Sequence, residues 1–259
     1  MMNTAISMID PSHTSPPPQT TKKRFFRTAA AEAEDAALAE TYAFRPIQQS
    51  DRNRVKVLHE NWFPVVYQDD FYDDLVQERL AGKKLHTRVA TVGNDEESSD
   101  GQIVSCVVGS FIPWAKLSRR MQALLLPDKA RFRRLFYIMT LGTVDEHRKT
   151  GLASSLVRWV ESLVQEDPAC GGVYLHVITY NDSAIRFYER LGFYRVEEIP
   201  DYYEIEGQKY ASYLYAKYYH GNRGHRDIVR VVRQAFMSLL RNIVYWIPGS
   251  GGDRISSGK

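Results

Sequence analysis

Residues 135–163 carry the pattern that most constrains the fold of this chain: an apolar strand, a basic turn that contains glycine, and an amphipathic helix. The run from Leu135 to Val144 is rich in apolar and β-branched side chains, which predicts a buried strand. After the turn, leucine and valine recur at helical spacing at positions 152, 156, 160 and 163. This strand–turn–helix order predicts a mixed α/β domain.

The turn itself has the features of a diphosphate-binding site. Gly151 and Ala153 leave the backbone N–H groups at the start of the helix without large side chains in front of them, and a helix N-terminus attracts anions. Arg148 and Lys149 add positive charge. The alternative is an ordinary strand-to-helix turn with a solvated basic rim, because short motifs also match by chance.

The composition indicates a globular protein of a reducing compartment. The 259 residues are 44% hydrophobic and 25% charged, which suits one domain with appendages and a sizeable core. Cys106 and Cys170 are isolated and lie in no metal-ligand spacing with a histidine, so we expect neither a disulfide framework nor a zinc site. The sequence has no apolar run long enough to span a membrane and no secretory signal pattern at its start.

We divide the chain into three parts. Residues 1–41 are poor in large apolar side chains, so we expect a mostly disordered N-terminal extension, with a marginal helix over its Ala/Glu stretch. Residues 42–219 form the predicted domain, and residues 222–259 form a basic tail. The charge is uneven, because the segment from His220 onward carries +5 while the net charge of the whole chain is +3.

The tail predicts a basic amphipathic helix. One face carries Ile228, Val232, Phe236, Leu239, Ile243 and Trp246, and the other carries Arg226, Arg230, Arg233 and Arg241. A basic amphipathic helix with an aromatic end is typical of an anchor that lies in the plane of a membrane surface. The alternative is a helix that packs on the domain or on a second subunit.

Hydrophobic periodicity predicts the other elements of the domain. We expect strands at 44–47, 86–92, 103–112, 135–144, 172–179, 193–198 and 211–218, and helices at 51–62, 69–80, 152–167 and 182–191. Residues 113–134 read as a basic, irregular excursion, and a loop with Pro200 and Asp201 should separate the last two strands. The sum is one mixed α/β layer architecture.

Three segments in this order resemble the GCN5-related N-acetyltransferase superfamily. They are the Arg-x-x-Gly-x-Ala turn, the strand that ends at Thr179, and the Asn…Ala…Phe-Tyr-Glu…Gly-Phe pattern of residues 181–193. The resemblance covers about residues 42–219. It implies a central mixed, mostly antiparallel sheet flanked by helices, with acetyl-CoA as cosubstrate and no metal.

The resemblance places acetyl-CoA on the central strand, the basic turn and the two following helices. The implied binding residues are Leu141, Thr143, Val144, Arg148, Lys149, Thr150, Gly151, Leu152, Ala153, Ser154, Asn181 and Tyr188. Backbone N–H groups from Leu141 to Val144 would stabilise the oxyanion if the strand bulges there. Tyr188 is the candidate for protonating the leaving thiolate, or else it only packs against the helix.

Within the superfamily, residues 62–67, 137–142, 174–177 and 202–203 look like those of membrane-associated N-terminal acetyltransferases. That resemblance implies Tyr137 and His176 as catalytic residues. It also implies a site for the substrate's first residues at Phe63, Pro64, Val65, Tyr67, Tyr202 and Tyr203. The alternative for each of these side chains is a purely structural role in the core or on the sheet.

The resemblance, together with an apolar pocket at Phe63 and Val65, implies an N-terminal α-acetyltransferase acting on Met-starting protein N-termini, in particular those of membrane proteins. An α-amino group is partly neutral near pH 7, so a base with the ordinary pKa of His176 suffices, and Tyr137 can order a relaying water. The alternatives are a lysine (histone) acetyltransferase and a membrane-tethered acyl-CoA-binding module without activity. We expect the cytosolic face of a membrane, at the Golgi, with the plasma membrane or plain cytoplasm as alternatives. We expect no nucleic-acid partner and make no prediction of oligomeric state.

Overall fold

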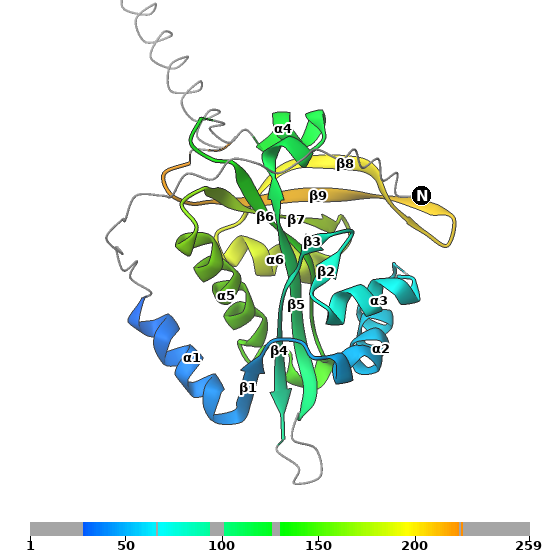
Figure 1. Cartoon of the computed structure of the whole chain (residues 1–259), viewed down its shortest axis with the longest axis vertical. Helices are drawn as coiled ribbons and strands as arrows, with labels where there is room; N and C mark the ends of the chain where they lie inside the picture. The colour runs from blue at the N-terminus through cyan, green and yellow to red at the C-terminus, as the bar shows by residue number, and fades with distance from the viewer. Residues whose placement is uncertain (1–27, 66, 94–100, 126–129, 223, 225–259) are drawn as a thin grey trace, which may run out of the picture.

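The computed structural model describes residues 28–65, 67–93, 101–125, 130–222 and 224. Most of the predicted N-terminal extension and nearly all of the predicted tail lie outside them. A seven-stranded sheet in the order β1-β4-β5-β6-β7-β9-β8 forms the centre, and β2 and β3 make a separate hairpin (Figure 1). Within the described ranges, no helix has the length and apolarity needed to cross a bilayer.

The element bounds follow the predicted order with additions. The strands are β1 (Tyr42–Arg45), β2 (Arg79–Leu80), β3 (Lys83–Lys84), β4 (His86–Val92), β5 (Gln102–Pro113), β6 (Arg134–Thr143), β7 (Cys170–Ile178), β8 (Tyr194–Ile205) and β9 (Gln208–Tyr218). The α-helices are α1 (Ala29–Thr41), α2 (Arg52–Trp62), α3 (Asp69–Val76), α4 (Arg119–Leu125), α5 (Leu152–Glu166) and α6 (Asp182–Arg190), with single 3₁₀ turns at Gln49–Asp51, Trp114–Lys116 and Asp145–His147. Only β6 and β7 pair in parallel, so the sheet is mixed and mostly antiparallel as predicted.

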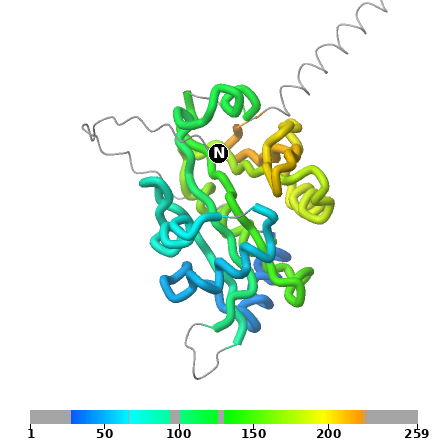
Figure 2. Tube along the Cα trace, turned by 90° about the vertical axis from the view of Figure 1, so that its right-hand side faces the viewer, coloured from blue at the N-terminus to red at the C-terminus, as the bar shows by residue number. Residues whose placement is uncertain are grey.

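Helices cover both faces of the sheet, because successive side chains of a strand point to opposite sides. On β5, Val107 belongs to the core under α5 and α6, whereas Val108 belongs to the core under α2 and α3. Figure 2 shows these helices on the two sides of the central strands. A third apolar cluster, with Leu125 and Leu214, joins α4 to the strands from β6 to β9.

Helix α1 belongs to the folded unit, which therefore begins before the predicted domain boundary at residue 42. Thr28 caps the helix, with its hydroxyl accepting from the N–H of Ala31. Leu38 is buried against the start of α5, and Asp35 forms an ion pair with Arg158 of α5 at 2.5 Å. An Ala/Glu helix of low amphipathicity is held here by tertiary contacts, which a local pattern does not reveal.

Three local predictions differ from the structure. The second predicted helix ends at Val76 rather than near residue 80, because Glu78 adopts a positive φ just after it, and Ala81 and Gly82 then turn the chain into the β2–β3 hairpin. The excursion from 113 to 134 contains α4. The loop predicted around Pro200 lies inside β8, where the pairing with β9 shifts register between Ile199 and Tyr203.

Candidate functional site

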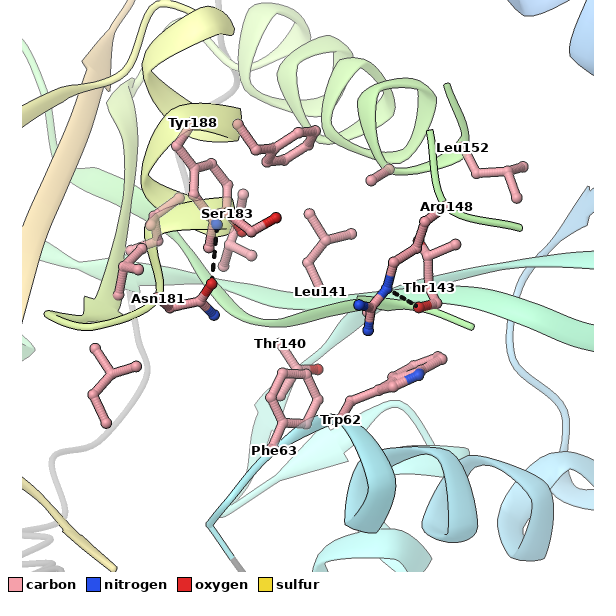
Figure 3. A pocket seen from close by; sticks show the side chains of 18 of the residues that line it. Trp62, Phe63, Thr140, Leu141, Thr143, Arg148, Leu152, Asn181, Ser183 and Tyr188 are labelled. Atoms are coloured by element: carbon pink, nitrogen blue, oxygen red, sulfur yellow. Dashed lines mark hydrogen bonds between the residues drawn. The ribbon is translucent and has the colours of Figure 1, made fainter. Parts of the chain in front are cut away.

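The parallel strands β6 and β7 pair only over their first halves. Cα partners run from Arg134 and Cys170 to Tyr137 and Tyr174, after which β6 follows β5 and β7 follows β9. Residues 138–143 and 175–178, which come after the separation, line one cavity of about 690 Å³ (Figure 3). This opening places backbone groups of the central sheet beside a space large enough for an elongated ligand.

The backbone groups that face the opening follow from the alternation along β6. The N–H of Val144 donates to Val104 O at 2.9 Å and Gly142 O accepts from the Ser105 hydroxyl, so residues 142 and 144 face β5. Alternation therefore directs the N–H and C=O of Leu141 and Thr143 toward the opening. In agreement, Thr143 O faces away from β5 and accepts from Arg148 Nε at 3.2 Å.

This geometry corrects the predicted oxyanion site. The Val144 N–H is already bonded to Val104, and Val144 does not line the cavity. The register between β5 and β6 is regular from Thr140 to Thr143, and the irregularity lies at Met139, between the partners of Val108 and Gly109. The donors on this strand are thus Leu141 and Thr143, next to a bulge that lies earlier than predicted.

The start of α5 forms one end of the cavity. Gly151 occupies the N-cap position with φ of 100°, and Lys149 also has a positive φ of 64°. A turn of this kind, followed by a helix N-terminus with Ala153 and Ser154 in its first turn, points backbone N–H groups at a bound anion. Arg148 is exposed and pairs with Asp145 at 2.7 Å, so its guanidinium is held at the rim of the turn.

Helix α1 places a carboxylate next to this turn. Glu34 lines the cavity, and a Cβ added to Gly151 would lie 3.0 Å from Glu34 Oε1. The other carboxylate oxygen of Glu34 accepts from Arg158 at 2.9 Å. Sequence reasoning missed Glu34, because nothing local links residue 34 to a turn more than a hundred residues later in the chain.

The opposite wall of the cavity is aromatic. Phe63, Pro64, Val65, Tyr67 and Tyr203 line it, as the sequence predicted for the substrate site. A packed group of aromatic rings supports these wall residues. Within it, Tyr67 stacks on Phe71 with ring centroids 4.3 Å apart.

Trp62 and Gly142 form a close contact beside that wall. A Cβ added to Gly142 would lie 2.1 Å from Trp62 Cε3, so only glycine leaves room for the indole on β6. Trp62 also lines the cavity (Figure 3). This contact holds the end of α2, and with it the Phe63–Pro64 turn, against the central strand.

Tyr137, Tyr202 and His176 form a hydrogen-bonded chain. The Tyr202 hydroxyl lies 3.1 Å from His176 Nδ1, and the Tyr202 ring stacks on the imidazole. The same hydroxyl also bonds to the Tyr137 hydroxyl. His176 lines the cavity, whereas Tyr137 and Tyr202 do not. The two predicted catalytic residues are therefore brought together, and Tyr202, predicted for substrate binding, is the link between them.

Burial governs the protonation of these groups. Desolvation lowers the pKa of His176 to about 3, so the imidazole is neutral at physiological pH. Burial likewise raises the pKa of Tyr137 well above its ordinary value, and its phenol keeps its proton. The expectation of an ordinary pKa for His176 was wrong, because the pattern of a strand does not reveal how completely a polar side chain is desolvated.

The remaining predicted residues divide by position. Those that line the cavity are Leu141, Thr143, Arg148, Lys149, Gly151, Leu152, Ala153, Ser154, Asn181 and Tyr188. Thr150 does not, since it faces solvent and its hydroxyl donates to His147 O. Asn181 caps α6 through a bond from the Ala184 N–H at 3.0 Å. The lining residues that sequence reasoning missed are Glu34, Trp62, Ile138, Met139, Thr140, Gly142, His147, Leu175, Val177, Ile178, Ser183, Ala184, Phe187 and Arg190.

Comparisons with known proteins agree with this geometry. The model of the acetyltransferase (GNAT) family matches residues 52–193. N-alpha-acetyltransferase 60 of Xenopus tropicalis is 34% identical over 192 residues, which are 73% of this chain and 74% of that protein. Histone acetyltransferase MCC1 of Arabidopsis thaliana is 28% identical over 201 residues, 78% of this chain and 79% of that protein.

Solved structures of NAA60 from Arabidopsis thaliana have the same fold. The complex with acetyl-CoA has 32% sequence identity and a TM-score of 0.60, and covers 70% of this chain and all of that one. The complex with a bisubstrate analogue gives a TM-score of 0.59 at the same identity, covering 70% of this chain and 99% of that one. The predicted resemblance to N-terminal acetyltransferases is confirmed, and the relatives found are NAA60 (NatF) proteins.

Proposed function

This chain belongs to the acetyltransferase (GNAT) family, and from that premise we propose that it transfers the acetyl group of acetyl-CoA to the free α-amino group of proteins that begin with methionine. The observation that carries the proposal is the opening between β6 and β7. It joins the anion-binding start of α5, the neutral His176 and the aromatic wall around Phe63 in one cavity.

The residues of the cavity fit acetyl-CoA, which supplies an activated acetyl thioester. Leu141 and Thr143 direct backbone groups into the opening, where they can pair with the amide groups of an extended ligand arm. The turn before α5 can bind a diphosphate through its N–H groups and Lys149. Tyr188 lines the cavity, and burial raises the pKa of its phenol, so it keeps a proton that can be donated to the leaving sulfur.

His176 receives the proton of the attacking amine. For Nε2 to accept a proton, Nδ1 must carry a hydrogen and donate it to the Tyr202 oxygen. Because the pKa of His176 is about 3, the imidazolium is unstable, and Tyr202, which contacts Nδ1 and is 39% exposed, offers a route by which the proton leaves to solvent. The rise of kcat/KM with pH should then report the substrate amine, with a pKa of about 7.7–8.0, and show no group near pH 6.5.

Selection of methionine rests on the aromatic wall. Phe63 and Val65 offer an apolar surface of the kind that an unbranched thioether side chain fills well. Pro64 fixes the direction of the chain between them. Tyr203 belongs to the same aromatic wall and its hydroxyl is 3.5 Å from His176 O, so the wall extends to the proposed base.

The proposal also includes association with a membrane. The support is the sequence of residues 226–247, a basic amphipathic pattern that ends in Trp246 and Pro248. We place the enzyme on the cytosolic face of a membrane, at the Golgi, where it would meet the N-termini of membrane proteins. Deletion of residues 225–259 should release the protein from membranes while acetylation of soluble peptides continues, and retained membrane fractionation would refute this assignment.

A lysine acetyltransferase is the second candidate, because one relative is named a histone acetyltransferase. A lysine side chain has a reference pKa of about 10.4, so it needs a stronger base than an α-amino group. His176, with a pKa of about 3, is a weak base and suits an amine that already reaches the site partly neutral, as an α-amino group does and a lysine side chain does not. The site therefore favours the α-amino group.

Acetyl transfer to two matched peptides separates the candidates. One peptide has a free Met N-terminus, and the other is N-blocked with an internal lysine. We expect turnover on the free terminus alone, and a loss of about 100-fold or more in kcat with His176→Ala. Turnover on the blocked peptide would establish the lysine reaction, and binding of acetyl-CoA without turnover on either would establish a binding module.

A second pair of variants tests the hydrogen-bonded chain. Tyr202→Phe removes the hydroxyl between His176 and Tyr137, and we expect kcat to fall about tenfold or more with little change in the KM for peptide. Tyr210→Phe is the matched control on the same hairpin, since its hydroxyl bonds only to the nearby Gln208 side chain among the described residues. Equal effects of the two variants would contradict the role of Tyr202.

A further inference from the structure

A cluster of exposed cations surrounds α4. Lys116, Arg119, Arg120, Arg131 and Arg133, here called the α4 surface, are all exposed. None of them forms an ion pair with another residue of the described part of the chain. Their neighbour Arg134 differs, because it pairs with Asp167 and stacks over Phe111.

The scaffold beneath these cations is rigid. The Trp114 N–H donates to Arg133 O at 2.8 Å, which ties the segment before α4 to the start of β6. Gln122 of α4 donates to Leu117 O at 2.9 Å, and the Tyr218 hydroxyl donates to Leu125 O at 2.5 Å. The cations therefore project from one fixed surface.

The described chain ends at this surface. A Cβ added to Gly221 would lie 3.6 Å from Arg131 Nη1, and Asn222 Nδ2 donates to Gly171 O at 2.9 Å. Gly221, close to the end of the described chain, thus lies beside Arg131. The sequence after residue 224 contains six further Arg or Lys residues against two Asp, in the amphipathic pattern described above.

The α4 surface lies far from the cofactor turn at the start of α5. It adjoins the first residues of β6, whereas the cofactor turn follows the last residue of this ten-residue strand. At about 3.3 Å per residue the two ends are roughly 30 Å apart. Figure 1 shows α4 at the end of the sheet opposite to α1, the helix that brings Glu34 to the turn.

We propose that the α4 surface binds anionic lipid headgroups next to the tail, and so fixes the orientation of the domain with the cofactor turn directed away from the bilayer. The inference rests on the proposed membrane association and extends it to the folded domain. Charge supports a lipid partner, since basic clusters close to an amphipathic helix bind anionic leaflets. Among the described residues of this surface Phe132 is buried and Trp114 is only partly exposed, so little ring area is available for nucleic-acid bases to stack on.

Vesicle partitioning of the full chain tests the proposal. The variant Lys116→Gln/Arg119→Gln/Arg120→Gln removes three charges from the α4 surface, and Arg79→Gln/Lys83→Gln/Lys84→Gln removes three exposed charges from the β2–β3 hairpin as a matched control. Each cation near an anionic surface contributes about fivefold to binding, so the first variant should lose between about 10- and 100-fold in partitioning onto phosphatidylserine-containing vesicles. The control should bind like the wild type.

The outcomes distinguish this inference from the proposed function. Both variants should acetylate a soluble Met-starting peptide at the wild-type rate, because neither changes the cavity. Equal losses of vesicle partitioning in the two variants would show that only the net charge of the protein matters, and would overturn the inference. Unchanged partitioning of the first variant would overturn it while leaving tail-mediated association intact. An equal loss on pure phosphatidylcholine vesicles, or displacement from lipid by a duplex oligonucleotide, would also refute an anionic-lipid site.

Discussion

The pH dependence of stability tests how His59 packs among the aromatic rings that support the wall around Phe63. Its ring is buried within the rings of Trp62, Phe63, Tyr67, Phe71 and Tyr72, with centroids between 5.3 and 6.2 Å away. Neither ring nitrogen has a hydrogen-bond partner among the residues that the structure describes. Desolvation in this apolar surrounding lowers the pKa of His59 to about 4.

The sign of the effect follows from proton linkage. The folded state keeps His59 neutral, whereas the unfolded chain binds a proton there with a pKa near 6.5. The unfolded state therefore gains protons as the pH falls below 6.5, and the free energy of unfolding decreases down to about pH 4. Between about pH 8 and pH 5 this amounts to about 2 kcal/mol for His59. His176, whose pKa is about 3, contributes a similar loss.

The assay compares the wild type with His59→Phe, and with His59→Leu as a second variant if the larger ring packs poorly. Urea unfolding at the two pH values gives the loss of stability for each protein. The wild type should lose about 2 kcal/mol more than either variant. The carboxylates titrate in all three proteins, so their effect cancels, and the initial stability of a variant does not enter the difference. Identical losses would show that His59 takes up a proton without unfolding and would refute the reasoning.

Two further substitutions test contacts that shape the cavity. Glu34→Gln should tighten acetyl-CoA binding about fivefold at low salt and less at high salt, because it removes a carboxylate beside an anion site while Asp35 still holds α1 to α5. Glu40→Gln on the exposed side of α1 is the control, and calorimetric titration showing equal affinities would contradict this prediction. Gly142→Ala should displace Trp62, lower the free energy of unfolding by about 1–3 kcal/mol and raise the KM for peptide. Unchanged denaturant midpoint and KM would refute the close contact.

The parts of the site that could be predicted from the sequence are those encoded by contiguous residues. The turn from Arg148 to Ala153 combines a strand end, glycine and a helix start, and it lies at the cavity as expected. The wall from Phe63 to Val65 follows a helix that proline stops, which is also a local signal. Such segments carry their geometry with them, so a resemblance in sequence is also a resemblance in shape.

The parts that could not be predicted depend on long-range packing. Glu34 reaches the cofactor turn through the docking of α1 on α5, and Trp62 occupies the space above Gly142 through the packing of α2 on β6. Both contacts join residues far apart in sequence. The irregular stretch of β8 before Tyr203 was predicted as a loop because Pro200 and Asp201 are turn formers, yet pairing with β9 continues on both sides of it.

The irregularities in β6 and β8 bear on function because each changes which side chains reach the opening. The register of β8 shifts around Tyr202, so the side chains there do not simply alternate between the two faces of the sheet. The Tyr202 ring stacks on His176. The shift at Met139 lies where β6 leaves β7, so the strand changes its alternation at the point where its backbone becomes available to a ligand. In a regular sheet β7 would pair along all of β6 and close the opening. The departures from regular pairing are therefore what places a neutral histidine, its tyrosine partners and free backbone groups around one cavity.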